Sequence, residues 1–102
     1  MKTIDWGKTL KHLKLLREGN VSLKKYCCKA LHLKEANCSG ECDTCKYDMD
    51  NHISQQELAE VMKVDKSRLI NLENGKCILR IEELLFYCEA CNLPIEEILV
   101  FE

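Results

Sequence analysis

Long apolar runs are missing from this chain, and their absence excludes whole classes of protein. No hydrophobic run approaches the length of a membrane-spanning helix. The first residues, MKTIDWGKTLKH, lack the apolar region of a secretory signal peptide. We therefore expect a cytoplasmic protein, in a compartment where thiols stay reduced.

Catalytic patterns are missing as well. The sequence contains no nucleophile paired with a base, no phosphate-binding loop and no pair of carboxylates arranged for acid–base work. A chain of 102 residues forms one compact domain, or a domain with a small stapled subdomain, and has no room for a large enzyme barrel. We expect a protein that is not an enzyme and that has no small-molecule substrate.

Strand patterns are scarce, whereas apolar residues recur at helical spacing along the chain. The expected helices begin near Asp5, Ser22, Ser54, Asp65, Glu82 and Ile95. The helix that begins near Glu82 is expected to bury Leu84, Leu85, Tyr87, Cys88 and Cys91. The predicted fold class is therefore all-α, a small helical bundle.

The stretch from Ile53 to Lys76 carries the most specific signal. Ser54 and Glu57 have the spacing of a capping box, in which the two side chains and two backbone amides bond reciprocally. Asp65 is expected to cap a second short helix, and Gly75 to end it in the left-handed conformation. Two short helices joined by a tight turn, the second polar and basic outside, are typical of a helix-turn-helix.

This stretch, SQQELAEVMKVDKSRLINLENGK, resembles the DNA-binding helix-turn-helix of the Cro/phage-repressor (XRE-type) transcriptional regulators. The resemblance covers residues 53–99 and implies a lambda-repressor-like bundle that binds double-stranded DNA. The family commonly binds as a homodimer, although no coiled coil or obvious dimer patch marks this sequence. Lys63 departs from the family pattern, which has Gly in the turn, and a lysine takes that left-handed conformation at a cost of roughly 1 kcal/mol.

The resemblance also assigns roles to individual residues. Lys66, Ser67 and Asn71 fall at base-reading positions, and Arg68 lies beside them at the DNA backbone or a base edge. Lysine can donate to guanine O6 and N7, and asparagine matches the N6/N7 edge of adenine. The expected phosphate contacts are Gln55, the side chains and backbone amides of Asn74, Gly75 and Lys76, and in addition Arg80.

The first helix of the helix-turn-helix domain is expected to be the one from Ser22 to Ala36. In the family, Glu73 pairs with a basic residue of that first helix, here Lys25 or Lys29. Residues 1–21 then form an added basic helix, and residues 22–102 form the helix-turn-helix domain.

Charge is distributed unevenly along the chain, although the formal net charge is only −2. Residues 1–34 carry nine basic against two acidic side chains (+7), residues 35–62 one against seven (−6), and residues 63–102 five against eight (−3). Because nucleic-acid binding depends on the local density of Lys and Arg, the global sign does not exclude it. A solvated lysine-rich helical face is the alternative interpretation of the N-terminal part.

Eight cysteines in a reducing compartment need an explanation other than disulfides. Cys38, Cys42 and Cys45 stand in an acidic insert at about residues 37–52, with spacings that let three sulfurs share one ion. Thiolates favour zinc or an iron–sulfur cluster, and a structural zinc takes four ligands. We predict Zn²⁺, with an iron–sulfur cluster as the alternative.

The fourth ligand is predicted to be Cys27, on the inward face of the preceding helix, with Cys28 as the second choice and His52 as the third. Cys88 and Cys91 are interpreted as small core residues, because a free cysteine packs as a small hydrophobe. Two other functions stay open. One is a regulator in which the cysteine cluster is a metal or redox switch, and the other is an antitoxin-like protein-interaction module without DNA binding.

Overall fold

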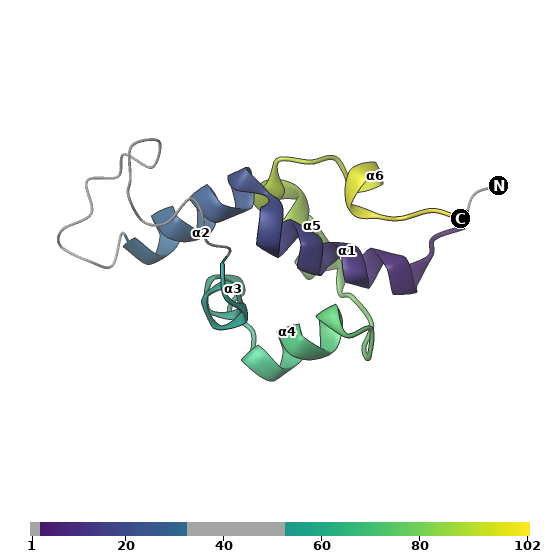
Figure 1. Cartoon of the computed structure of the whole chain (residues 1–102), viewed down its shortest axis with the longest axis horizontal. Coiled ribbons are helices and arrows are strands. Elements are labelled where there is room, and N and C mark those ends of the chain that lie inside the picture. The colour runs from purple at the N-terminus through teal and green to yellow at the C-terminus, as the bar shows by residue number, and fades with distance from the viewer. Residues whose placement is uncertain (1–2, 33–52) are drawn as a thin grey trace.

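The computed structural model describes residues 3–32 and 53–102, and these residues form six α-helices (Figure 1). They are α1 (Trp6–Gly19), α2 (Val21–His32), α3 (Gln55–Met62), α4 (Lys66–Glu73), α5 (Ile81–Cys91) and α6 (Ile95–Ile98). An isolated antiparallel bridge joins Ile4 to Phe101 near the two termini. The all-α prediction is confirmed. Within the described ranges, no helix is both long enough and apolar enough to span a membrane.

One hydrophobic core joins the described helices. Its members are Leu10, Leu13, Leu16, Leu23, Cys27, Ile53, Leu58, Ala59, Leu69, Leu72, Leu79, Leu84, Tyr87, Ala90, Cys91 and Ile98. All six helices contribute to this list, so the two described segments pack as one unit. Close-packed apolar side chains are the main stabilising contribution in a bundle of this size.

The first helix is an integral part of that bundle. α1 supplies Leu10, Leu13 and Leu16 to the core and packs against α4, α2 and α6. It also supplies Arg17, which pairs with Glu73 at the end of α4. α1 is therefore packed into the bundle, and it supplies the basic partner of Glu73 that the resemblance implies for the first helix of the domain.

The second helix belongs to the same bundle. α2 packs mainly against α5 and α3, with Leu23 and Cys27 fully buried. Asn20 precedes it, and the side-chain oxygen of Asn20 accepts from the backbone N–H of Leu23 at 2.8 Å. Tyr26 is partly exposed and meets the ring of Phe86 edge-on at 5.5 Å between centroids. The expected end of this helix at Ala36 lies outside the described residues.

The turn between α3 and α4 has the expected geometry. Ser54 Oγ accepts from the N–H of Glu57, and the Glu57 carboxylate accepts from the N–H of Ser54, both at 3.1 Å, so the capping box is confirmed. Lys63 ends α3 with φ 60° and ψ 41°, the left-handed conformation that the turn requires. Asp65 precedes α4 as expected, but its carboxylate makes no capping hydrogen bond.

The fifth helix differs from its predicted burial at one residue. Tyr87 and Cys91 are buried and Cys88 is partly buried, as expected of core positions. Leu85, however, is 56% exposed, so the prediction that it is buried is wrong. The reason is that α2 and α6 cover only part of the circumference of α5 and leave Leu85 outside. The hydroxyl of Tyr87 is buried without a hydrogen-bond partner among the described residues.

Candidate nucleic-acid interface

The fourth helix has one buried and one exposed side. Leu69 and Leu72 are fully buried in the core, which fixes the rotation of the helix about its own axis. Lys66, Ser67 and Asn71 are exposed on the opposite side. A short helix held in this way presents two donors and a hydroxyl to an external partner, which is what recognition of base edges requires.

Arg68 is committed to contacts within the protein. Its Nε donates to Glu83 Oε2 at 3.0 Å, and its Nη2 donates to Glu83 Oε1 and to the carbonyl of Ile78, both at 2.7 Å. The guanidinium thereby joins α4 to the start of α5 through a two-bond ion pair. The expected DNA contact of Arg68 competes with this arrangement, so Lys66, Ser67 and Asn71 are the predicted base-reading residues whose side chains are exposed.

The ion pair shifts the pKa values of both Glu83 and Arg68. Burial by itself would raise the pKa of Glu83, but hydrogen bonds from the Arg68 side chain and the Arg80 backbone N–H outweigh it. The net effect is a pKa of Glu83 below its ordinary value. The hydrogen bond to Glu83 raises the pKa of Arg68. Both groups are therefore held in their charged forms at neutral pH.

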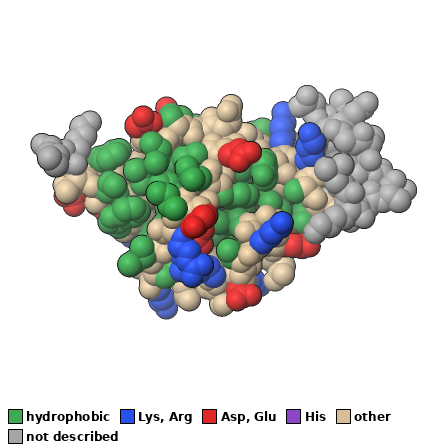
Figure 2. Space-filling view, turned by 180° about the vertical axis from the view of Figure 1, so that it is seen from behind, with side chains coloured by type: hydrophobic (Ala, Val, Ile, Leu, Met, Phe, Trp, Pro, Cys, Tyr) green, Lys and Arg blue, Asp and Glu red, His purple; other side chains and the backbone are tan. Residues whose placement is uncertain are grey.

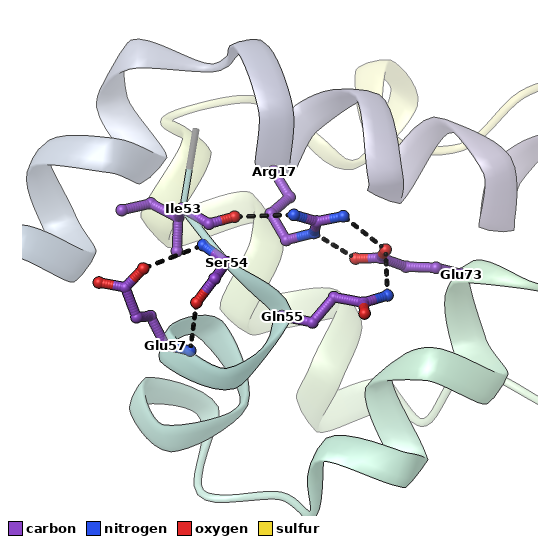
Figure 3. A network of polar contacts seen from close by, with 6 residues as sticks. All are labelled: Arg17, Ile53, Ser54, Gln55, Glu57 and Glu73. Atoms are coloured by element: carbon purple, nitrogen blue, oxygen red, sulfur yellow. Dashed lines mark hydrogen bonds and ion pairs between the residues drawn. The ribbon is translucent and has the colours of Figure 1, made fainter. Parts of the chain in front are cut away.

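A second polar network joins α1, the start of α3 and the end of α4 (Figure 3). Arg17 reaches Glu73 through Nε and Nη2, at 2.8 and 3.0 Å, and its Nη1 donates to the carbonyl of Ile53 at 2.8 Å. Gln55 Nε2 donates to Glu73 Oε1 at 3.0 Å. Every side chain in this group comes from a different helix, so the network fixes α1, α3 and α4 relative to one another.

This network corrects one prediction and restricts another. Glu73 is structural, as expected, but its partner is Arg17 rather than Lys25 or Lys29. Gln55, the expected phosphate contact, is half-buried and uses one amide N–H on Glu73. One feature of the sequence could have indicated the buried pair of Arg17, because this residue falls on the apolar stripe of its helix. An arginine on a buried stripe requires an acidic partner.

The turn after α4 corrects the prediction for backbone amides. The N–H groups of Asn74, Gly75 and Lys76 donate to the carbonyls of Ile70, Leu72 and Asn71, at 3.0, 3.1 and 2.8 Å. Gly75 adopts φ 73°, which allows the chain to close on the helix end in this way. These three amides are therefore already satisfied and do not donate to phosphate. The side chains of Asn74 and Lys76 are exposed.

Some of the predicted metal ligands lie among the described residues and others do not. Cys38, Cys42 and Cys45, together with His52, lie outside the described residues. Cys27 lies in the core, where burial, and to a smaller extent the charge of Cys91, raises its pKa to about 12. Cys28 is also buried. In the described ranges, no group of three or more potential ligands lies close enough to hold an ion.

The described helices form a small bundle of the helix-turn-helix type. Residues 49–98, just under half of the chain, match the family model described as Helix-turn-helix, so this segment resembles a helix-turn-helix domain. The match supports a DNA-binding regulator in general terms. Searches of curated proteins and of solved structures found no match to the chain.

Proposed function

We propose that this protein is a sequence-specific, cytoplasmic transcriptional regulator that reads the major groove of DNA with α4. The observation that supports this proposal most directly is the exposure of Lys66, Ser67 and Asn71 on a helix whose other side is locked into the core. The N-terminal half of α4 faces the base edges in this arrangement. Lys66 donates to guanine, and Asn71 forms a pair of hydrogen bonds with adenine.

Phosphate contacts orient the domain on the duplex. The exposed side chains of Asn74 and Lys76 are placed just beyond the C-terminal end of α4. Gln55 contributes its remaining amide hydrogen, while Glu73 holds the amide in one orientation. Such contacts strengthen binding to every duplex and carry no sequence information.

The proposal is tested by selecting a cognate duplex from a random library and measuring binding by fluorescence anisotropy. Lys66→Ala and Asn71→Ala should each weaken cognate binding by about 1–3 kcal/mol and relax the base preference. Gln55→Ala and Lys76→Ala should weaken binding to all duplexes alike. Lys14→Ala removes an equally exposed lysine from α1 and should change little. If none of the four site variants changed duplex binding, the groove-reading role would be wrong.

Salt dependence separates DNA binding from the protein-interaction alternative. A domain that neutralises phosphates loses affinity steeply as salt concentration rises, because binding releases condensed counterions. A protein-interaction module that only keeps the helix-turn-helix shape would show weak duplex binding with little salt dependence. We expect the steep dependence.

We further propose that Cys38, Cys42 and Cys45 hold a zinc ion with Cys27 as the fourth ligand. The support comes from the spacing of the three thiols and from the position of Cys27 on α2, the helix that leads into the insert. Bound zinc would stabilise the thiolate of Cys27, whose burial otherwise favours the protonated form. Its role is that of a structural staple before α3. Cys28 and His52 remain the alternative fourth ligands, and an iron–sulfur cluster the alternative cofactor.

We also propose that two copies associate through an apolar surface formed by Ile78, Ile81 and Leu85. These side chains are 85%, 67% and 56% exposed, and the last two lie one turn apart on α5. Figure 2 shows that hydrophobic side chains gather over a broad area of the rear face of the molecule. No dimer patch is evident from the sequence, because Leu85 has the spacing of a core residue and its exposure appears only when α5 is placed in the bundle.

A further inference from the structure

A polar hollow of about 430 Å³ lies where the α3–α4 turn approaches the start of α5. Its lining residues are Lys63, Val64, Asp65, Arg68 and Arg80. Lys63 and Arg80 are exposed, and no ion pair joins either side chain to another residue in the described parts of the chain, although the charge of Arg80 helps to lower the pKa of Glu83. The proposed base-reading residues Lys66, Ser67 and Asn71 are not among the residues that line this hollow.

The charge inside the hollow favours an anion. Arg68 is bonded to Glu83, so its charge is balanced within the protein. The remaining charged side chains are those of Lys63, Arg80 and Asp65, which are two cations against one carboxylate. An anion here would meet a compact ammonium on one side and the flat donor fork of a guanidinium on the other.

The backbone at Lys63 gives a second, independent reason to look for a ligand. Lys63 has φ 60°, a conformation that glycine adopts without strain and a side chain adopts at a cost to stability. Strain of this kind persists where the side chain has a role that glycine cannot fill. The side chain of Lys63 is exposed and forms no hydrogen bond or ion pair within the described ranges, so it is available to an external ligand.

We infer that Lys63 and Arg80 bind one phosphate of the DNA backbone in this hollow, beside the bases that α4 reads. This inference rests on the proposed function. Lys63 and Arg80 donate to the phosphate oxygens, and Arg68, fixed by Glu83, forms the rigid wall behind them. Asp65 faces the same hollow and repels the phosphate, which limits the affinity.

The test uses the full chain and the substitution Lys63→Gly, because this change moves stability and binding in opposite directions. Relief of the left-handed strain should raise the melting temperature by roughly 4 °C. Loss of the ammonium should weaken binding about two- to fivefold for cognate and non-cognate duplexes alike. It should also reduce the slope of log K against log salt by about 1. Damage to the fold cannot produce this combination.

Two further variants complete the test. Arg80→Gln should weaken binding to all duplexes in the same way as Lys63→Gly. Asp65→Asn should strengthen it, because Asp65 makes no capping hydrogen bond that the change would remove, and asparagine no longer repels the phosphate. Lys14→Ala on α1 is the control for loss of a distant positive charge.

The outcomes are distinguishable. If Lys63→Gly raised the melting temperature but left binding and the salt slope unchanged, while Lys66→Ala weakened binding, the phosphate site would be refuted and the reading role of α4 would stand. If Lys66→Ala, Asn71→Ala and Lys63→Gly all left binding unchanged, both would be refuted. If inorganic phosphate stabilised the wild type but not Lys63→Gly, and duplex binding was indifferent to Lys63, the hollow would be a free-phosphate site and the DNA assignment would be wrong.

Discussion

Arg17 of α1 and Glu73 of α4 form a buried ion pair, with Nε 2.8 Å from Oε2 and Nη2 3.0 Å from Oε1. Their side chains are only 7% and 1% exposed. The third donor of the guanidinium holds the carbonyl of Ile53, immediately before α3. One arginine therefore joins three elements behind the proposed reading helix, and the placement of α4 depends on it.

Removing one partner of this pair should be strongly destabilising. Arg17→Ala leaves the Glu73 carboxylate buried without its cation, and we expect the free energy of unfolding to fall by about 3–5 kcal/mol. Chemical denaturation followed by circular dichroism measures this change. The double variant Arg17→Met with Glu73→Leu should recover much of the loss, because it buries no unpaired charge. A change below about 0.5 kcal/mol for Arg17→Ala would show that the pair does not support the fold.

The pair between Arg68 and Glu83 should make stability depend on acid pH. Because the folded-state pKa of Glu83 is lowered, its contribution is fully present above the ordinary value of 4.5 and is lost as pH falls through the folded pKa. We expect the wild type to lose more stability between pH 5 and pH 3 than Glu83→Gln does. Identical pH profiles in thermal melts of the two proteins would contradict the assignment.

The zinc proposal predicts a defined metal content. Protein purified without added metal should contain one zinc per chain, and chelation should lower its melting temperature because the bound metal stabilises the folded state. Cys27→Ser should lose the zinc, whereas Cys91→Ser, a comparably buried residue of the same core, should retain it. Loss of zinc in Cys28→Ser but not in Cys27→Ser would assign the ligand to Cys28. If the purified protein were brown and contained iron and sulfide, the cofactor would be an iron–sulfur cluster and the zinc assignment would be wrong.

The apolar surface on α5 predicts self-association. Sedimentation equilibrium of the wild type should show a dimer at micromolar concentration, and Leu85→Lys should shift it to monomer, because a charge on an apolar contact is costly to bury. Leu15→Lys is a matched control, since Leu15 is an equally exposed leucine on α1. A monomeric wild type, or equal dissociation by both variants, would remove α5 as the interface.

Local features of the fold were predictable from the sequence, because they depend on residues within one turn of each other. The Ser54–Glu57 capping box and the left-handed Gly75 each follow from hydrogen bonds between near neighbours, and α4 begins after Asp65 as expected, although the Asp65 carboxylate makes no capping bond. The left-handed conformation of Lys63 was implied by the resemblance, which has Gly at that position of the turn. Helical spacing likewise indicated that Leu69 and Leu72 are buried and that Lys66 is not.

Interactions between distant residues were decided by the tertiary structure alone. The sequence offered Glu73 several basic partners, and only the packing of α1 against α4 selects Arg17. In the same way, Arg68 stands on a polar helical face, but the approach of α5 binds it to Glu83. Leu85 has the spacing of a core residue, yet no described helix covers it. The physical reason is that helical periodicity fixes which side of a helix is apolar, whereas the partner of a buried charge depends on which helices meet in space.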